Sequence, residues 1–269
     1  MKKFLAKTPS RHHILKFQKK LYQSLVKYGL ISETNLEALQ TNENIFDILE
    51  FDKKTVKFIL EQNGYSYNDC NLSWHYHIFA GWKAYCDKNN TPVINILEIG
   101  THDGRFTYFL SKLFHDANIY TIDLPKNDQQ FVNSYNRENC EKLSNFLKIR
   151  DENLRLKNTK FIELNSIHIL RHFNGMKFDA IWIDGDHHDP QVSIDLANCI
   201  NLLNPNGIMC NDDVIKSPDH QKDTYVSNES FKTLNHFEKN KVLENWFVFK
   251  RIRTSARRFE KYISISKLS

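Results

Sequence analysis

The sequence predicts an α/β protein with a doubly wound, mostly parallel sheet, and three observations lead to this fold class. A run of Val, Ile and Leu begins at Val93, breaks at a turn with two glycines and resumes with helical periodicity. A second β-branched run, 118–124, follows that helix. Further along, short apolar runs alternate with helical patterns up to residue 213. Alternating strands and helices are typical of a parallel sheet covered by helices on both faces.

The strands and helices can be placed by residue range. Each expected strand is a short apolar run; these are 93–99, 118–124, 159–165, 177–184 and 208–213. The helices expected around them are 105–114, 139–154, 166–173, 190–203 and 227–238. Residues 204–207, Asn-Pro-Asn-Gly, predict a turn before the fifth strand. Two later runs, 242–252 and 261–268, also have strand character.

The N-terminal part carries no strand signal and predicts a helical appendage at 1–90, before an α/β domain at 91–269. Apolar side chains three or four apart predict an amphipathic helix over 11–28, and further helices are expected from Ser32 and over 45–62.

Two tryptophans, two histidines and a tyrosine stand close together in 71–82, just before the first strand. One interpretation is a substrate wall in which His75 or His77 acts as a base. The other is a helical core stripe made by Trp74, Ile78 and Trp82, with the histidines satisfied locally. Both interpretations stay open.

Composition restricts the location and the partners. No apolar run approaches the roughly 20 residues of a membrane span, and the N-terminus does not read as a secretory signal. The five cysteines are scattered and never spaced as C-x-x-C, which indicates reduced thiols in a cytoplasmic protein without a zinc site. The formal net charge is +5, and basic residues gather at both ends. We favour a solvated helix face over contact with nucleic acid or anionic lipid.

The glycine turn predicts a ligand with a positive end. Gly100 and Gly104 let the backbone approach a ligand, and the next helix offers free N–H groups. Glu98 is acidic where a pyrophosphate would favour positive charge, and Asp123 is placed to hold the two hydroxyls of a ribose. His102, in the middle of the turn, further disfavours a dinucleotide.

The pattern Glu98-x-Gly100-x-x-x-Gly104 followed by Asp123 resembles the class I S-adenosylmethionine (SAM)-dependent methyltransferases, although His102 replaces a common glycine. The resemblance implies a Rossmann-like, seven-stranded sheet whose last two runs form an antiparallel edge hairpin. It implies that the turn wraps the methionine part of SAM, that Asp123 holds the ribose and that Ser166 contacts adenine. The expected SAM-binding residues are Glu98, Gly100, Thr101, His102, Gly104, Asp123, Ser166 and Asp184.

A second group of acids follows the fourth and fifth strands, with Asp184 in Ile-Asp-Gly-Asp-His-His and Asp212 and Asp213 in Cys-Asn-Asp-Asp. Carboxylates that meet at one sheet edge repel one another unless a cation lies among them. Their oxygens suit Mg²⁺ or another divalent metal. Such a metal orients an acceptor hydroxyl and lowers its pKa, and a neighbouring His takes the proton.

This second pattern resembles metal-assisted O-methyltransferases of the catechol, sugar and antibiotic types, over about residues 93–215. The resemblance implies metal ligands at Asp184, Asp212 and Asp213, although the third is usually Asn. It implies catalytic roles for Asp184 and for His187 as the base, with His188 as the second choice. The alternatives are that the acids cap turns, that Asp184 faces SAM as in metal-free relatives, and that His187 is a surface or supporting residue.

The leading hypothesis is a bacterial SAM-dependent O-methyltransferase that modifies a hydroxyl of a small polar molecule, such as a sugar or glycan precursor. The basic ends motivate a second hypothesis, nucleic-acid methylation, which we rank lower because no RNA-binding module is recognisable. A non-catalytic SAM-binding protein is the third, and an NAD oxidoreductase is a distant fourth. The oligomeric state stays open between a monomer and a homo-oligomer.

Overall fold

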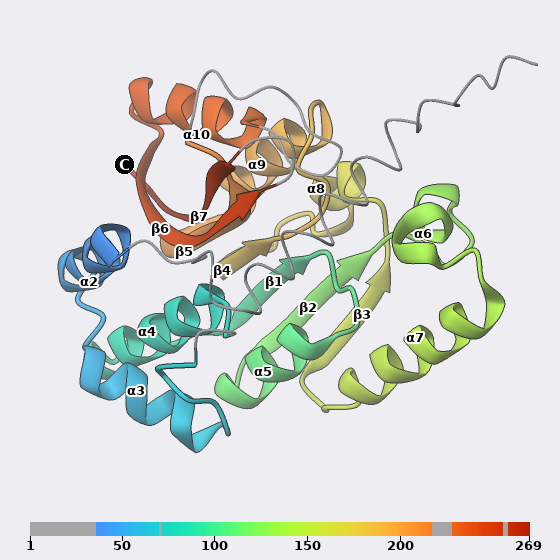
Figure 1. Cartoon of the computed structure of the whole chain (residues 1–269), viewed down its shortest axis with the longest axis horizontal. Coiled ribbons are helices and arrows are strands. Elements are labelled where there is room, and N and C mark those ends of the chain that lie inside the picture. Colours follow the sequence, from blue (N-terminus) through green and yellow to red (C-terminus); the bar gives the residue numbers. More distant parts are fainter. Residues whose placement is uncertain (1–35, 70–71, 217–227, 255–257) are drawn as a thin grey trace, which may run out of the picture.

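The computed structural model describes residues 36–69, 72–216, 228–254 and 258–269. Within them, seven strands form one sheet in the order β3-β2-β1-β4-β5-β7-β6 (Figure 1). The five parallel strands are β1 (Asn95–Ile99), β2 (Asn118–Asp123), β3 (Thr159–Glu163), β4 (Phe178–Ile183) and β5 (Leu203–Val214). The antiparallel edge is formed by β6 (Leu243–Thr254) and β7 (Arg258–Leu268). The predicted fold class and edge hairpin are confirmed, although 204–207 belong to β5 and not to a turn before it.

Helices cover both faces of the sheet (Figure 1). On one face lie α4 (Trp74–Lys88), α5 (Arg105–Leu113) and α7 (Cys140–Asn153). On the other lie α8 (Ile169–His172), α9 (Gln191–Leu202) and α10 (Glu229–Lys239). The connection after β2 holds α6 (Gln129–Asn133) and the 3-10 helix η1 (Ser134–Asn136), and η2 (Ser166–His168) precedes α8.

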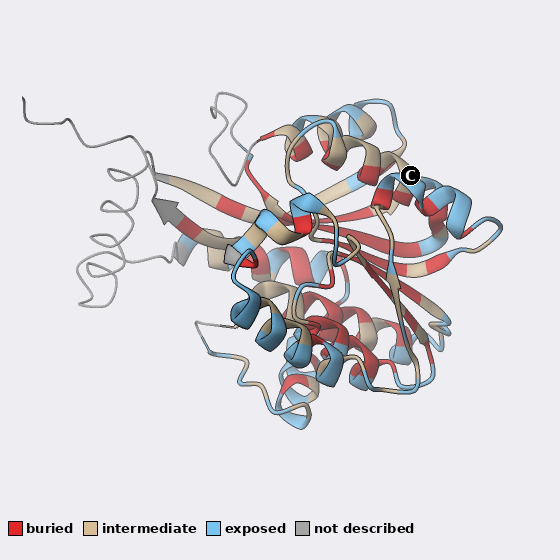
Figure 2. Ribbon diagram, turned by 90° about the vertical axis from the view of Figure 1, so that its right-hand side faces the viewer, coloured by how far each residue is buried: buried red, intermediate tan, exposed pale blue. Residues whose placement is uncertain are grey.

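Side chains of the central strands alternate between two hydrophobic cores, one on each face of the sheet. In β1, Ile96 packs in the core on the α4–α5 side, and Leu97 packs in the core on the α9 side. In β4, Trp182 packs in the core on the α4–α5 side and Ile183 packs in the core on the α9 side. In Figure 2 much of the sheet and of the helix surfaces that face it is coloured as buried. Burial on both faces explains why the strands read as continuous apolar runs.

The N-terminal helices α2 (Leu36–Ile48) and α3 (Lys53–Gln62) share the α4–α5 core. The prediction of one helix over 45–62 is wrong, because Glu50 takes a left-handed φ of 58° and the Asp52 carboxylate accepts the N–H of Thr55 at 2.8 Å. Such a capping bond starts a new helix. The domain division at residue 90 stays a prediction, and the expected helix over 11–28 lies outside the described residues.

Asn42 of α2 holds the outermost strand, β6. Its side-chain amide donates to the carbonyl oxygen of Phe249 at 2.9 Å, and its Oδ1 accepts the N–H of Phe249 at 2.6 Å. Asn42 is fully buried. The outward-facing backbone groups of Phe249 are therefore satisfied by one side chain.

Two register shifts occur at the same level of the antiparallel edge. The β5–β7 pairing shifts between Asn211 and Val214, and the β6–β7 pairing shifts between Phe249 and Arg251. Tyr262 of β7 marks the common level, because it pairs with Val214 on one side and Phe249 on the other. Bulges of this kind re-aim side chains at the rims of sheets.

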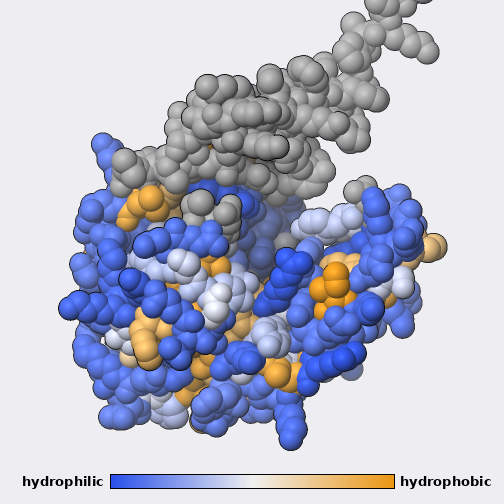
Figure 3. All heavy atoms as spheres, turned by 60° about the horizontal axis from the view of Figure 1, so that its bottom comes forward, coloured by the Kyte–Doolittle hydropathy of each residue, from blue (hydrophilic) through white to orange (hydrophobic). Residues whose placement is uncertain are grey.

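On the face shown in Figure 3, apolar side chains of the described residues are scattered among hydrophilic ones. Among the helices of the described ranges, none combines the length and the apolar character that a membrane crossing requires.

Candidate active site

Gly100 follows the end of β1 and lies against Asp184, at the end of β4. It takes a left-handed φ of +97°, and a Cβ there would lie 2.2 Å from the carbonyl oxygen of Asp184. The N–H of Asp184 in turn donates to the carbonyl oxygen of Ile99 at 2.8 Å. A side chain at position 100 would separate the two strand ends. Gly104, with a φ of +75°, marks the N-terminus of α5.

Asp123, at the end of β2, organises this turn. Its Oδ2 accepts the N–H of His102 at 3.0 Å, and its Oδ1 accepts the N–H of Leu124 at 2.8 Å. Burial raises the pKa of Asp123, and the two N–H donors only partly offset that effect. Each carboxylate oxygen keeps a second lone pair for a further donor, such as a ribose hydroxyl. His102 itself has a φ of 48°.

Glu98 lies behind the turn and is only 1% exposed. The hydroxyls of Thr107 and Thr121 both donate to its Oε2, the latter at 2.6 Å. The hydroxyl oxygens of Thr121 and Thr101 are 2.6 Å apart, so a chain of hydroxyl groups connects Glu98 to the turn. Burial raises the pKa of Glu98 to about 8. We therefore interpret Glu98 as a residue that holds the turn, and not as an exposed ligand of the cofactor.

Replacing Glu98 by Gln is expected to flatten the pH dependence of folding stability. The folded pKa of about 8 lies above the ordinary value of 4.5, so the folded state holds the proton more tightly. This contribution is complete below pH 4.5 and is lost as the pH rises through 8, by at most about 1.4 kcal/mol per pH unit. Urea unfolding from pH 5 to 9 measures it. Exposed Glu244→Gln is the control, and equal slopes in wild type and Glu98→Gln would contradict the assignment.

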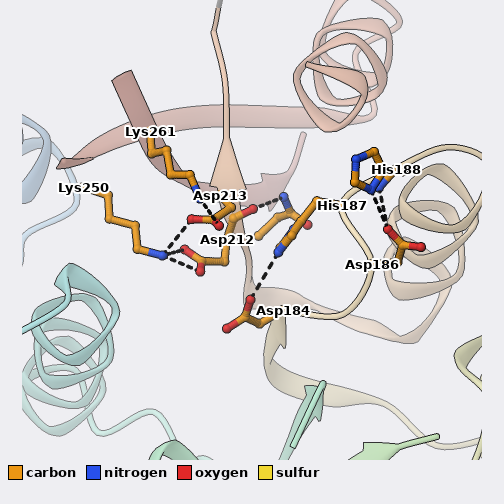
Figure 4. Close-up of polar contacts among 9 residues, drawn as sticks. Asp184, Asp186, His187, His188, Asp212, Asp213, Lys250 and Lys261 are labelled. Atoms are coloured by element: carbon orange, nitrogen blue, oxygen red, sulfur yellow. Dashed lines mark hydrogen bonds and ion pairs between the residues drawn. The ribbon is translucent and has the colours of Figure 1, made fainter. Parts of the chain in front are cut away.

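Asp184 and His187 form a pair at the end of β4, with 3.5 Å between Asp184 Oδ1 and His187 Nε2 (Figure 4). The surrounding protein and the charge of Asp212 raise the pKa of Asp184 to about 6, although 36% of its side chain is accessible. Burial alone would lower the pKa of His187, but Asp184 and Asp213 outweigh it and raise that pKa. The pair is therefore suited to proton transfer near neutral pH.

His188 points to a different partner. Its Nδ1 lies 2.9 Å from Oδ1 of Asp186, away from the Asp184–His187 pair (Figure 4). Of these two histidines, His187 is therefore the one that lies beside Asp184, whereas His188 lies beside Asp186.

The charged cluster, which we define as Asp212, Asp213, Lys250 and Lys261, lies beside this pair (Figure 4). The Nζ of Lys250 donates to both oxygens of Asp212, at 2.7 and 2.5 Å, and to Oδ1 of Asp213 at 2.9 Å. Lys261 donates to the other oxygen of Asp213. Burial would raise the pKa of Asp213, but the two ammonium groups hold it well below the usual range.

The predicted metal ligands Asp184, Asp212 and Asp213 do not fit a metal in this arrangement. Both oxygens of Asp212 and both of Asp213 already accept from lysines. Within the described ranges, His, Cys, Asp and Glu side chains form no group of three able to hold a metal ion. Lys250 and Lys261 supply the positive charge that the sequence analysis expected from a metal. The sequence analysis did not identify either lysine. The one signal that could have indicated them is that both lie in the predicted edge strands, 242–252 and 261–268.

Residues 74–82 fit the interpretation of a helical core stripe, because Ile78 and Trp82 lie in the hydrophobic core on the α4–α5 side and Trp74 packs against it. His77 lies in the hydrophobic core, with its Nε2 2.9 Å from the carbonyl oxygen of Tyr67. His75 instead packs on Trp182, with ring centroids 5.0 Å apart, and its buried Nδ1 finds no hydrogen-bond partner among the described residues. Burial lowers the pKa of His75 to about 3, so its ring is neutral at neutral pH and is not a proton carrier there.

Ser166 begins η2, and its hydroxyl accepts a bond from Nε2 of Gln191 at 2.8 Å. Gln191 also donates to Asp195, so Ser166 belongs to a polar network with α9. Its contact with adenine stays a prediction.

Tyr135 is a residue that the sequence analysis missed. It takes a left-handed φ of 56°, is 76% exposed and packs edge-on against His102, with 5.0 Å between ring centroids. Residues in rare backbone conformations cluster at active sites and ligand clamps. Its position beside the turn makes it a candidate contact for a bound nucleoside.

Comparison with protein families finds one match. Residues 97–214 match the model of a family described as a methyltransferase domain. The matched range runs from β1 to the end of β5, and so contains the turn, Asp123, Asp184, His187 and the acids of the charged cluster. A comparison with curated proteins finds no match.

Several solved structures are similar to this chain. The O-methyltransferase TomG from Streptomyces achromogenes, in complex with SAM, is 14% identical and has a TM-score of 0.48, covering 94% of this chain and 98% of its own. Cofactor-bound Rv0187 from MTB is 14% identical with a TM-score of 0.49, covering 86% and 89%. The O-methyltransferase from Bacillus cereus, in complex with SAH, is 12% identical with a TM-score of 0.45, covering 94% and 99%.

Proposed function

We propose that this chain, whose residues 97–214 carry a methyltransferase domain, transfers the methyl group of SAM to a hydroxyl oxygen of a small polar acceptor. The observation that carries the proposal is the Asp184–His187 pair, placed between the glycine turn and the charged cluster. An acceptor with several hydroxyls, such as a sugar or glycan precursor, suits a site lined by carboxylates and ammonium groups.

The cofactor assignment rests on the turn and on the charge around it. Asp123 offers one free lone pair on each oxygen beside the backbone of His102, which suits the two hydroxyls of a ribose. SAM, when bound, supplies an electrophilic methyl group on a positively charged sulfur. Three carboxylates (Asp184, Asp212 and Asp213) face two ammonium groups, so with His187 neutral the site carries one excess negative charge. That excess favours a cationic sulfur.

His187 is the proposed general base. Its imidazole takes the proton of the acceptor hydroxyl as the oxygen attacks the methyl carbon and the carbon–sulfur bond breaks. The carboxylate of Asp184 holds the ring and stabilises the imidazolium that forms. The products are the methylated acceptor, S-adenosylhomocysteine (SAH) and a proton on His187.

Divalent-metal assistance is the second form of this proposal. A metal at Asp184, Asp212 and Asp213 would have to displace the ammonium group of Lys250 from three carboxylate oxygens. Those contacts support the metal-free form. We also retain the cytoplasm as the proposed location, in agreement with the free thiols of the four described cysteines.

Calorimetric titration with SAH, once with Mg²⁺ and once with EDTA, tests the proposal first. We expect micromolar binding that is unchanged by EDTA, followed by methyl transfer to members of a panel of sugars and phenols. Absence of SAH binding under both conditions would refute the cofactor. Salt-sensitive binding of RNA, together with inactivity on every small acceptor, would favour nucleic-acid methylation instead. SAH binding without transfer to any acceptor or RNA would leave only a SAM-binding protein.

A further inference from the structure

We propose that the charged cluster is a built-in cationic centre that takes the place of a divalent metal, and that Lys250 is the positioning residue within it. In this arrangement Lys250 holds Asp212 and Asp213 beside His187 without any metal. The catalytic meaning of this inference rests on the proposed function, whereas the charge arrangement can be tested without turnover.

The hydrogen bonds of Lys250 are the first argument. An ammonium group has three N–H donors and no acceptor. All three are used, two on the oxygens of Asp212 and one on Oδ1 of Asp213. Lys261 takes the remaining oxygen of Asp213. Two cations therefore neutralise the two acids, and each of the four oxygens that a metal would bind already accepts a bond from an ammonium group.

Burial is the second argument. The side chain of Lys250 is 8% exposed, that of Asp212 5% and that of Lys261 5%. Its Nζ lies 2.5 Å from Oδ2 of Asp212 and 2.9 Å from Oδ1 of Asp213, so two carboxylates surround the buried ammonium group. Removing one partner of such a buried group leaves an uncompensated charge. Lys250 is thus not a mobile surface lysine that a metal ion easily replaces.

The backbone provides the third argument, because the strand pairing is irregular at the residues of the charged cluster. Asp212 and Asp213 lie inside the register shift of β5, and Lys250 lies inside that of β6. Asp213 also takes a left-handed φ of 52°. Phe249, the residue before Lys250, is held by Asn42 on its outer side. Two bulges at one level and a buried clamp position three side chains from two strands at a single point.

Titration with Mn²⁺, followed by the electron paramagnetic resonance signal of the free ion, tests the inference. The wild-type chain is expected to bind no Mn²⁺ at this site up to millimolar concentration. Lys250→Met removes the ammonium group and frees oxygens of both acids, so we expect its affinity for Mn²⁺ to rise at least tenfold. Adding Asp212→Asn to that variant should abolish the gain. Lys267→Met, which alters a lysine of β7 that lies over the rings of Trp82 and Tyr85, is the matched control.

Catalysis provides the second readout. Lys250→Met should lower kcat and leave the Kd for SAH unchanged, because it disturbs Asp212 and Asp213 but not the glycine turn. Lys250→Arg keeps the positive charge. We therefore expect it to bind no Mn²⁺ and to have a higher kcat than Lys250→Met. EDTA should leave wild-type turnover unchanged.

One outcome overturns the inference: a wild-type chain that binds one Mn²⁺ with micromolar Kd, and loses it in Asp212→Asn, has a metal site after all. This titration of wild type decides the matter even if Lys250→Met fails to fold. The proposed function fails separately, through absence of SAH binding. A chain that binds neither SAH nor Mn²⁺ would keep the cationic centre and lose the methyl transfer.

Discussion

Replacing His187 by Gln is expected to lower kcat for methyl transfer by about 10²- to 10⁴-fold, the usual contribution of a general base. Gln keeps a polar side chain near Asp184 but does not accept a proton at neutral pH. The Kd for SAH should stay unchanged, because the base acts on the acceptor. Single-turnover transfer of a labelled methyl group separates the chemical step from binding.

The pH profile is the more specific readout for His187. The base works only when its imidazole is neutral, and Asp184 and Asp213 raise the pKa of that imidazole above its ordinary 6.5. Activity is therefore expected to fall as the pH decreases through the raised pKa, and this step should be absent in His187→Gln. His188→Gln is the matched control, since His188 is paired with Asp186, and it should stay within twofold of wild type. A large loss in His188→Gln with an active His187→Gln would reverse the assignment.

Replacing Asp123 by Ala is expected to raise the Kd for SAH by about 10²- to 10⁴-fold. Bonds to a charged group contribute about 1.5–3 kcal/mol each, and this carboxylate is proposed to accept two ribose hydroxyls. The variant also removes the acceptor for the N–H of His102, which loosens the turn. Calorimetry measures the change directly.

Two companion variants show whether the effect of Asp123 is specific. Asp116→Asn changes an exposed acid just before β2 and should leave the SAH affinity as it is. Asp212→Asn should reduce turnover and spare the affinity, because Asp212 belongs to the charged cluster on the acceptor side. Equal losses of SAH affinity in Asp123→Ala and Asp212→Asn would show that the acids do not divide into cofactor and acceptor groups.

The fold was predictable because its signals are local. A strand buried on both faces, such as β1 with Ile96 in one core and Leu97 in the other, is apolar throughout and stands out in the sequence. The glycine turn was equally visible. The sequence did not show, however, that a side chain at Gly100 would collide with the carbonyl oxygen of Asp184, which is far along the chain. The break between α2 and α3 was missed because Asp52 and Thr55 sit in an otherwise helical pattern.

The site was only partly predictable, for a different reason. The acids were found because they follow the ends of strands, where ligands bind in such sheets. Their cation was assigned to a metal, because the positions of Lys250 and Lys261 depend on strand pairing and on two register shifts that leave no periodic signal. Lys250 of β6 reaches the acids of β5 across β7, which lies between them in the sheet. Residue spacing alone does not predict such an ion pair.

The clamp between Asn42 and Phe249 also determines how the sheet ends. The last strand of a sheet normally carries a row of unpaired backbone groups, which another molecule can use as a template for adding a strand of its own. At Phe249 that template is already occupied by one amide from α2. Helix α2 thus protects the open edge of the sheet at Phe249 against strand addition, next to the rim where the charged cluster lies.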